Sequence, residues 1–374
     1  MLNMNRISFL YFFIISSFML TACDDSKIGE GVEYDRTAFL ENLADNIIIP
    51  SFTDFNNKVN DLNTAVLAFE TAQSESNLKI VQEALKTAWL SYQYVAYLEV
   101  GPSAALFFRE EVNIFPSDTI AISSKIENAD YVFTGASNID VKGFPALDYL
   151  VNGVGVTSVD RLNFYTDEAE GKLRIDYLIQ VTAELKRIAN TVQEAWPAYR
   201  ETFVTALGTD IGSSTGILVN EFNKQFDLRL KNGKVGIPSG VKSFERTNPD
   251  KVESYYGGYS KELAMASTQA ALMIFKGQHF GGSTDGEGFD DYLNALNAEV
   301  NGQALSITII DAIQFGFDQI EAVEGDFKSA AQVYNADGDL VEAYNALQAV
   351  IPLIKVDMTS EMGVTIAFQD NDGD

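Results

Sequence analysis

The sequence predicts an all-α protein made of two helical bundles. Apolar residues recur every three or four positions through most of the chain, as they do on one face of an amphipathic helix. The alternation of apolar and polar residues that marks a strand is nearly absent. A run rich in Gly and Ser at residues 208–216 interrupts the helical pattern. We therefore expect up-and-down helices in a first bundle over residues 37–207, a linker over 208–216 and a second bundle over 217–358.

Three long helices support the first bundle. The stripe of the first is Phe52, Phe55, Val59, Leu62, Val66 and Phe69. The second can be capped by Ser74 or Ser76 and ends at the Gly-Pro pair 101–102. Its stripe is Leu78, Val81, Leu85, Ala88, Tyr92 and Val95. The third begins near residue 168, and Pro50 and Pro197 are expected to interrupt or kink the helices in which they lie.

The second bundle is expected to contain shorter helices separated by loops. Their apolar stripes lie within residues 218–230, 260–274, 289–296, 310–320 and 340–354. An acidic tail, residues 359–374, is expected to fray. Two acidic loops, 285–291 and 335–339, contain oxygen ligands that calcium prefers, but a solvated turn with a helix cap explains both loops better.

Composition excludes several kinds of function. The 374 residues carry a net charge of −27, which argues against a nucleic-acid partner because phosphate binding needs a basic face. The chain has one His, His279, and one Cys, Cys23. One chain therefore cannot build a zinc site from several His or Cys ligands, or an internal disulfide. A Ser-His-Asp triad would need His279. Residues 212–216, Gly-Ser-Ser-Thr-Gly, look superficially like a Gly-x-Ser-x-Gly motif, but we interpret this run as part of the flexible linker between the bundles.

The N-terminus predicts a lipoprotein. Arg6 precedes an apolar run over residues 7–20, and residues 20–23 read Leu-Thr-Ala-Cys, which fits the bacterial lipobox. We expect a signal peptide at 1–22 and a lipidated Cys23 followed by a tether to residue 36. The predicted partner of Cys23 is the membrane, and the predicted location is the bacterial cell envelope, facing the periplasm or the cell surface. No later segment is apolar enough to cross a bilayer.

Residues 143–150 read Gly-Phe-Pro-Ala-Leu-Asp-Tyr-Leu and form the most distinctive stretch of the chain. A proline is well accommodated in the first turn of a helix, where its missing N–H costs nothing. Leu147 and Leu150 would then face the core. A purely structural role explains the stretch.

The same stretch resembles the Gly-x-His-x-x-Glu signature of the imelysin-like family, which includes the imelysin peptidase and proteins like iron-regulated protein A. Residues 89–102, a helix ending in Gly-Pro, also resemble this family. So do residues 251–256 (Lys-Val-Glu-Ser-Tyr-Tyr) followed by 260–263 (Ser-Lys-Glu-Leu). The resemblance covers residues 37–355. It implies two helical bundles with a cleft at their interface, in exported proteins described as metallopeptidases or tied to iron uptake.

This chain departs from the signature at two positions. Pro145 stands in place of the His and can neither bind a metal nor act as an acid or base. Asp148 stands in place of the Glu and keeps a carboxylate with a shorter reach. The resemblance therefore implies a weakened or remodelled metal site.

We expect no catalytic residue and a non-enzymatic binding component, with iron or another divalent metal as the candidate cofactor. The expected ligand-binding cleft is formed by Gly143, Phe144, Pro145, Asp148, Ser254 and Ser260. The candidate metal ligands are Asp148, Glu253 and His279. Two alternatives stay open: a metal-dependent peptidase of the imelysin type, or a surface scaffold that binds an envelope protein partner.

Overall fold

The computed structural model describes residues 34–368, all of which belong to one compact unit. The predicted signal peptide at 1–22 and the predicted lipidation site Cys23 lie outside the described residues. Within residues 34–368 no helix combines the length and the apolar character needed to span a bilayer.

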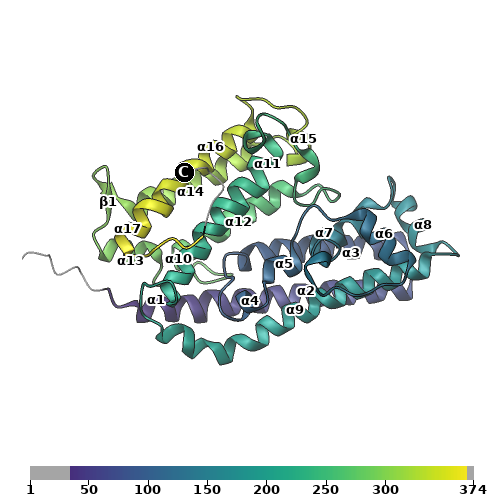
Figure 1. Cartoon of the computed structure of the whole chain (residues 1–374), viewed down its shortest axis with the longest axis horizontal. Coiled ribbons are helices and arrows are strands. Elements are labelled where there is room, and N and C mark those ends of the chain that lie inside the picture. The colour runs from purple at the N-terminus through teal and green to yellow at the C-terminus, as the bar shows by residue number, and fades with distance from the viewer. Residues whose placement is uncertain (1–33, 369–374) are drawn as a thin grey trace, which may run out of the picture. The chain divides into compact units, whose positions relative to one another are not determined.

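The first bundle is built on three long helices. Helix α1 (Arg36–Asn42) continues through a π-helical segment (Leu43–Ile48) into α2 (Ile49–Thr71). Helix α2 packs against α3 (Glu75–Val95) and α9 (Gly171–Thr205), and these helices run side by side in Figure 1. The connection from α3 to α9 contains α4 (Pro102–Ala105), α5 (Phe108–Val112), α6 (Thr119–Glu127), a 3-10 turn (Ala136–Asn138), α7 (Gly143–Asp148), a π-helical turn (Tyr149–Gly153) and α8 (Ser158–Thr166).

The predicted apolar stripes form the core of this bundle. Every member of the α2 stripe is buried, as is every member of the α3 stripe. Ser74, one of the two predicted caps, accepts a hydrogen bond from the Asn77 N–H at 3.3 Å and begins α3. Pro50 lies in the first turn of α2, directly after the π-helical segment, and α9 continues through Pro197.

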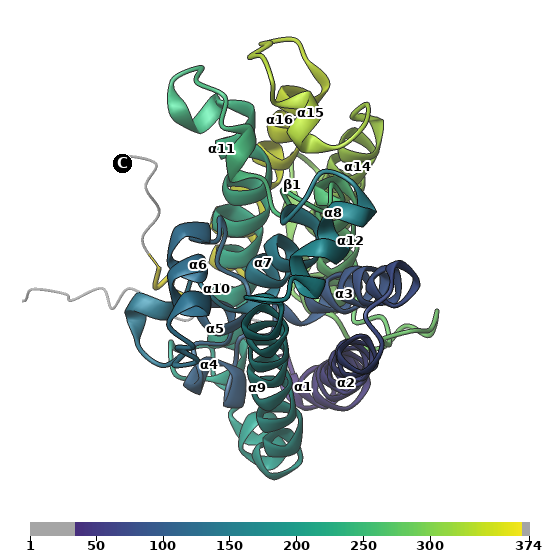
Figure 2. The ribbon, with the colours of Figure 1, turned by 90° about the vertical axis from the view of Figure 1, so that its right-hand side faces the viewer.

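The second bundle contains the remaining helices. They are α10 (Ser214–Lys224), a π-helical segment (Gln225–Gly236), α11 (Ile237–Ser239), two 3-10 turns (Val241–Ser243, Pro249–Lys251), α12 (Ser260–Phe275), α13 (Phe289–Ala295), α14 (Leu305–Ala322), α15 (Phe327–Ala330), α16 (Asp339–Pro352), a π-helical turn (Leu353–Met358) and α17 (Thr359–Met362). Helix α14 packs between α12 and α16, and α16 packs on the segment 225–236. The view in Figure 2 shows α11, α14, α15 and α16 above α2, α3 and α9.

Both ends of the second bundle differ from the expectation. Helix α10 begins inside the predicted linker, since Ser213 caps it and Ser214 and Thr215 are buried. The described part of the acidic tail is packed rather than frayed. Its backbone is held by Asn220 of α10, which donates to the Thr365 carbonyl at 3.0 Å and accepts from the Ala367 N–H at 2.7 Å.

One small hairpin was not predicted. Strands β1 (Glu299–Val300) and β2 (Gln303–Ala304) pair antiparallel just before α14. Asn301 and Gly302 connect them, both with positive φ, as a two-residue hairpin turn requires. Strands of two residues are too short to show the alternation by which a strand is recognised in sequence.

The two bundles meet along α3. Helix α12 packs on α3, so α3 is covered by α2 on one side and by the second bundle on another. At this junction Lys86 Nζ lies 3.0 Å from Glu262 Oε1 and 5.3 Å from the centre of the Tyr259 ring. The buried residues of both bundles form one continuous apolar core.

The cap of α3 provides a test of this description. Changing Ser74 to Ala removes the acceptor for an N–H in the first turn, which should lower the free energy of unfolding by about 1 kcal/mol. Ser76 lies inside the helix, so Ser76→Ala should leave stability nearly unchanged. Urea unfolding of both variants checks this, and equal losses would show that Ser74 is not the cap.

Candidate functional site

Helix α7 is fixed in place by its first two residues. Gly143 has φ +72°, and a Cβ atom there would lie 2.3 Å from the Val112 carbonyl oxygen, so only glycine fits. Phe144 is fully buried and stacks on Trp89 of α3 at 5.5 Å between ring centres. Pro145 follows in the first turn of the helix, as predicted, where its missing N–H costs nothing. These contacts set the position of Asp148, the last residue of α7.

Asp148 is the central polar group of the site. Its carboxylate is 1% exposed and accepts hydrogen bonds from Asn152 Nδ2 at 2.9 Å and from the Tyr256 N–H at 3.0 Å. Burial raises the pKa of Asp148 to about 6, and the hydrogen bonds, including one from the Gly257 backbone, oppose that rise. The carboxylate therefore loses its proton near neutral pH in a desolvated position.

The second bundle contributes the loop that precedes α12. Gly257 allows this loop to approach Asp148 closely, since a Cβ atom at Gly257 would lie 2.8 Å from Asp148 Oδ1 and 2.2 Å from the Tyr259 ring. Ser254 is buried in the same loop, with φ +55°. Residues 254–257 therefore bring backbone N–H groups of the second bundle to a carboxylate of the first.

A cavity of about 350 Å³ opens beside this carboxylate, and we call it the Asp148 cavity. The first bundle lines it with Phe115, Pro116, Ser117, Thr119, Pro145 and Asp148. The second bundle lines it with Asp250, Val252, Ser254, Tyr255 and Tyr256. Three of the predicted cleft residues, Pro145, Asp148 and Ser254, thus share one cavity.

Glu253 points into a separate buried group, which we call the Glu253 cluster. Lys234 Nζ donates to one carboxylate oxygen, and Asn113 Nδ2 donates to the other at 2.8 Å. Gln93 Nε2 lies 3.4 Å from Glu253 Oε1, the oxygen that also accepts from Asn113. The side-chain oxygen of Asn113 in turn accepts a hydrogen bond from Trp89 Nε1 at 2.9 Å. Burial lowers the pKa of Lys234, and the adjacent carboxylate raises it. Glu253 is therefore neutralised by a buried cation and is not free for a metal.

Four other predicted residues do not line the Asp148 cavity. Gly143 and Phe144 instead pack α7 in place, as described above, and Ser260 and His279 lie elsewhere in the second bundle. The Ser260 hydroxyl accepts a hydrogen bond from the Phe327 N–H at 3.1 Å and so holds α15 against α12. His279 lies in the loop after α12 and lines a different cavity of about 410 Å³ with Tyr94 and Gln314. The structure does not bring His279 to Asp148 and Glu253. Within residues 34–368 there is no group of three or more His, Cys, Asp or Glu side chains placed to hold a metal ion.

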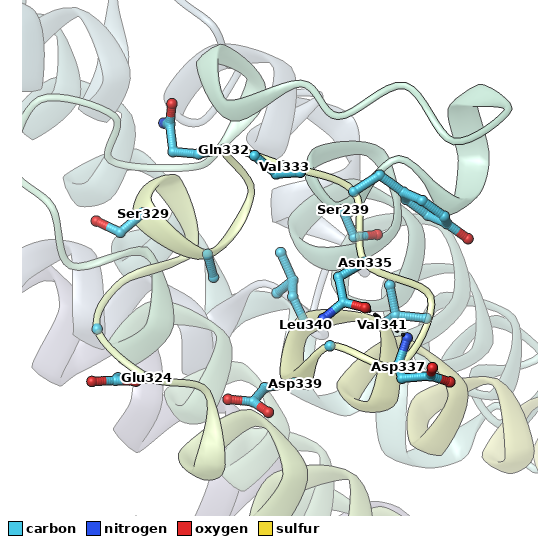
Figure 3. A pocket seen from close by; sticks show the side chains of 14 residues that line it. Ser239, Glu324, Ser329, Gln332, Val333, Asn335, Asp337, Asp339, Leu340 and Val341 are labelled. Carbon is cyan, nitrogen blue, oxygen red and sulfur yellow. Dashed lines mark hydrogen bonds between the residues drawn. The ribbon is translucent and has the colours of Figure 1, made fainter.

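A larger cavity, of about 920 Å³, lies elsewhere in the second bundle. Its lining comes mainly from residues 324–341, the connection between α14 and α16, and Figure 3 shows these side chains spread around the loop. Asn335, one of the candidate calcium ligands, accepts a hydrogen bond from the Asp337 N–H at 3.1 Å. This contact belongs to a turn that leads into α16. In the other acidic loop the Asp291 carboxylate caps α13 through the Gly288 N–H at 3.0 Å.

Sequence reasoning missed three polar residues of this region. Asn152 lies four positions after Asp148, a spacing that brings side chains together on a helix and was visible in the sequence. Lys234 and Asn113 carry no comparable signal, because each reaches Glu253 only through the tertiary fold.

The fold and the site define an all-α protein of two bundles, with a buried carboxylate beside a cavity that both bundles line. The Imelysin family model matches residues 48–353, so the chain belongs to this family. No curated protein matches the chain.

Two solved structures have the same fold. One, from Parabacteroides distasonis, is described as an iron-regulated protein A precursor, with a TM-score of 0.70 and 14% identity over 87% of this chain and 94% of the other. The second is an Imelysin-like protein from Psychrobacter arcticum, with a TM-score of 0.65 and 15% identity over 90% of this chain and 99% of the other. At these identities the likeness shows the fold alone.

The burial of Asp148 predicts a pH dependence of stability. Its pKa of about 6 in the folded protein lies above the unfolded value near 4, so the folded state binds more protons between these pH values. The free energy of unfolding should therefore fall by roughly 2 kcal/mol through this group as the pH rises from 4 to 7.

Asp148→Asn has no such proton to lose. Urea unfolding between pH 4 and 8 should show that the free energy of unfolding of the variant rises relative to that of the wild type up to about pH 7. Above that pH the difference between the two free energies should stay constant. A difference that does not change with pH would contradict the assigned pKa.

The Glu253 cluster predicts a strong effect of breaking its ion pair. Glu253→Gln leaves Lys234 buried without a counter-charge and should destabilise the protein by about 3–5 kcal/mol. The double variant Lys234→Met/Glu253→Gln removes both charges and should recover most of that loss. Urea unfolding of the two single variants and the double variant measures the coupling, and independent effects would rule out the buried pair.

Proposed function

We propose that this chain is a non-enzymatic binding protein of the bacterial cell envelope. It takes its ligand in the Asp148 cavity and serves the acquisition of iron or another metal. The observation that carries this proposal is the Asp148 carboxylate itself. It is ionised above about pH 6 and buried, and it forms no ion pair within residues 34–368; the charge of Lys328 lowers its pKa less than burial raises it. A buried charge of this kind is costly, and a ligand that brings a positive charge or hydrogen-bond donors offsets the cost.

The rest of the cavity suits a small organic molecule. Its volume falls in the range of small-molecule sites, and aromatic rings and two prolines line it together with a few hydroxyl groups. The Tyr255 ring has Lys328 over its face, with the ammonium 3.7 Å from the ring centre. Tyr255 and Phe115 offer apolar faces to the body of a ligand, while Asp148 fixes its orientation.

The donors do not fit a bare transition-metal ion. Both Asp148 oxygens already accept protein N–H groups, and Pro145 supplies no ligand atom. The other carboxylate of the cavity, Asp250, lies at an exposed position. A metal carried inside an organic complex is compatible with the cavity, because the organic part supplies the coordination. The Parabacteroides structure described as an iron-regulated protein A precursor supports the link to iron.

The peptidase alternative has less support. Hydrolysis of a peptide needs a nucleophile or an activated water, together with an acid or base to transfer protons. Asp148 has a suitable pKa, but no His, Cys or Lys lines its cavity. The scaffold alternative predicts a protein partner in place of a small ligand.

We also propose that the protein is anchored to a membrane of the bacterial cell envelope. Residues 20–23 fit a lipobox, and we propose that Cys23 is lipidated and holds the protein on the membrane through the tether that ends near residue 36. Labelling with a fatty-acid analogue in wild type and Cys23→Ser would test this anchor.

The test of the binding function uses protein purified from its native membrane with detergent. Native mass spectrometry should detect a retained small molecule in the wild type and in Asp311→Asn, a matched control on α14 that does not line the cavity. Asp148→Asn should lose it. Elemental analysis of the same samples shows whether metal accompanies the molecule.

Calorimetric titration with iron, copper, zinc and calcium salts completes the experiment. We expect no bare ion to bind more tightly than about 100 μM, which corresponds to roughly 5.5 kcal/mol. Tight binding of one ion that Asp148→Asn abolishes would contradict the organic ligand. A stoichiometric protein partner with no small molecule would favour the scaffold.

A further inference from the structure

A second cavity, lined by cationic side chains, lies next to the Asp148 cavity. Its volume is about 170 Å³, and we call it the basic cavity. The lining residues are Arg109, Phe115, Leu228, Arg229, Gly233, Lys234, Ile237 and Lys251. Four are cationic and none is acidic, in a chain whose net charge is −27. Phe115 lines both cavities.

The four cations are not equally neutralised by the protein. Lys234 is paired with Glu253. Arg109 lies 3.5 Å from Glu110, and Lys251 lies 3.9 Å from Asp250 in a largely exposed pair that adds little. Arg229 makes no ion pair within residues 34–368, and its Nε–H is buried without a hydrogen-bond acceptor.

Arg229 is therefore an unusual group in this fold. Burial lowers the pKa of Arg229, and the nearby positive charge of Arg109 lowers it further, while Glu110 and Glu99 oppose the shift. A guanidinium keeps its charge at any physiological pH, so the cost is borne as destabilisation rather than removed by deprotonation. Two guanidinium groups at one small cavity provide the planar donors that carboxylates and phosphates accept from.

We propose that the basic cavity binds an oxyanion group, a carboxylate or a phosphate, through the guanidinium groups of Arg109 and Arg229, with Lys251 adding charge at the exposed edge. The cavity has room for one such group and not for a large molecule. The ligand is a small inorganic or organic anion, or the anionic end of a molecule whose remainder lies outside. This site does not depend on the function proposed for the Asp148 cavity.

The test measures the binding of inorganic phosphate, sulfate, acetate and citrate to the purified protein by calorimetry at constant ionic strength. We expect millimolar or tighter binding of at least one of these anions to the wild type. Arg229→Gln should weaken it at least about tenfold, as the loss of a charge-assisted hydrogen bond implies. Lys251→Gln, at an exposed position, should weaken it less.

The matched control is Arg187→Gln, which makes the same chemical change at a surface residue of α9 paired with Glu184. It should bind the anion as the wild type does. Arg229→Gln should remain folded because it removes an unpaired, partly buried charge, and its melting temperature without anion should equal or exceed that of the wild type.

The outcomes separate the sources of the anion. Binding of phosphate and sulfate identifies a tetrahedral oxyanion site, and binding of acetate or citrate alone identifies a carboxylate site. If none of the four anions binds with a dissociation constant below about 10 mM (roughly 2.7 kcal/mol), the proposal is overturned. Binding that Arg229→Gln leaves unchanged would overturn it equally.

Discussion

The buried ion pair between Lys234 and Glu253 is the interaction on which the arrangement of this site depends. Two charges removed from water are stable only if each is paired and hydrogen-bonded. The ion pair therefore fixes the positions of the side chains that form hydrogen bonds with it. Lys234 comes from the π-helical segment of the second bundle, Glu253 from the loop before α12, and Asn113 from the connection after α5. The cluster thereby determines where the loop at 254–257 lies against α7.

Asp148 and Glu253 show how differently two buried carboxylates of one region are stabilised. Glu253 has an adjacent cation and two amide donors. Asp148 has N–H donors but forms no ion pair within residues 34–368, and burial raises its pKa more than these donors and the charge of Lys328 lower it. A carboxylate that lacks a counter-charge is the one that an incoming ligand can stabilise, whereas Glu253 already has its partner.

The sequence was sufficient for the features that depend on local spacing. The stripes of α2 and α3 were visible because helical periodicity is a local property. The place of Pro145 in the first turn of α7 was visible too, and the cap of α3 was narrowed to Ser74 or Ser76, of which the structure uses Ser74. The family resemblance indicated which loop of the second half approaches the signature, and Ser254 does line the same cavity as Asp148. Long-range pairings were not accessible in this way. Nothing near Lys234 in the sequence indicates that its ammonium meets Glu253, and His279, a candidate ligand by residue type, lies at a different cavity.

Phe115 lies in the wall of both the Asp148 cavity and the basic cavity. A ligand that shifted this ring to fit one of the two proposed sites would change the shape of the other, and it would couple the two sites through a single side chain. Such coupling is reciprocal: whatever factor one ligand applies to the affinity of the second, the second applies to the first. If both proposed sites are occupied, one aromatic ring would make the release of the molecule in the Asp148 cavity respond to the concentration of the anion.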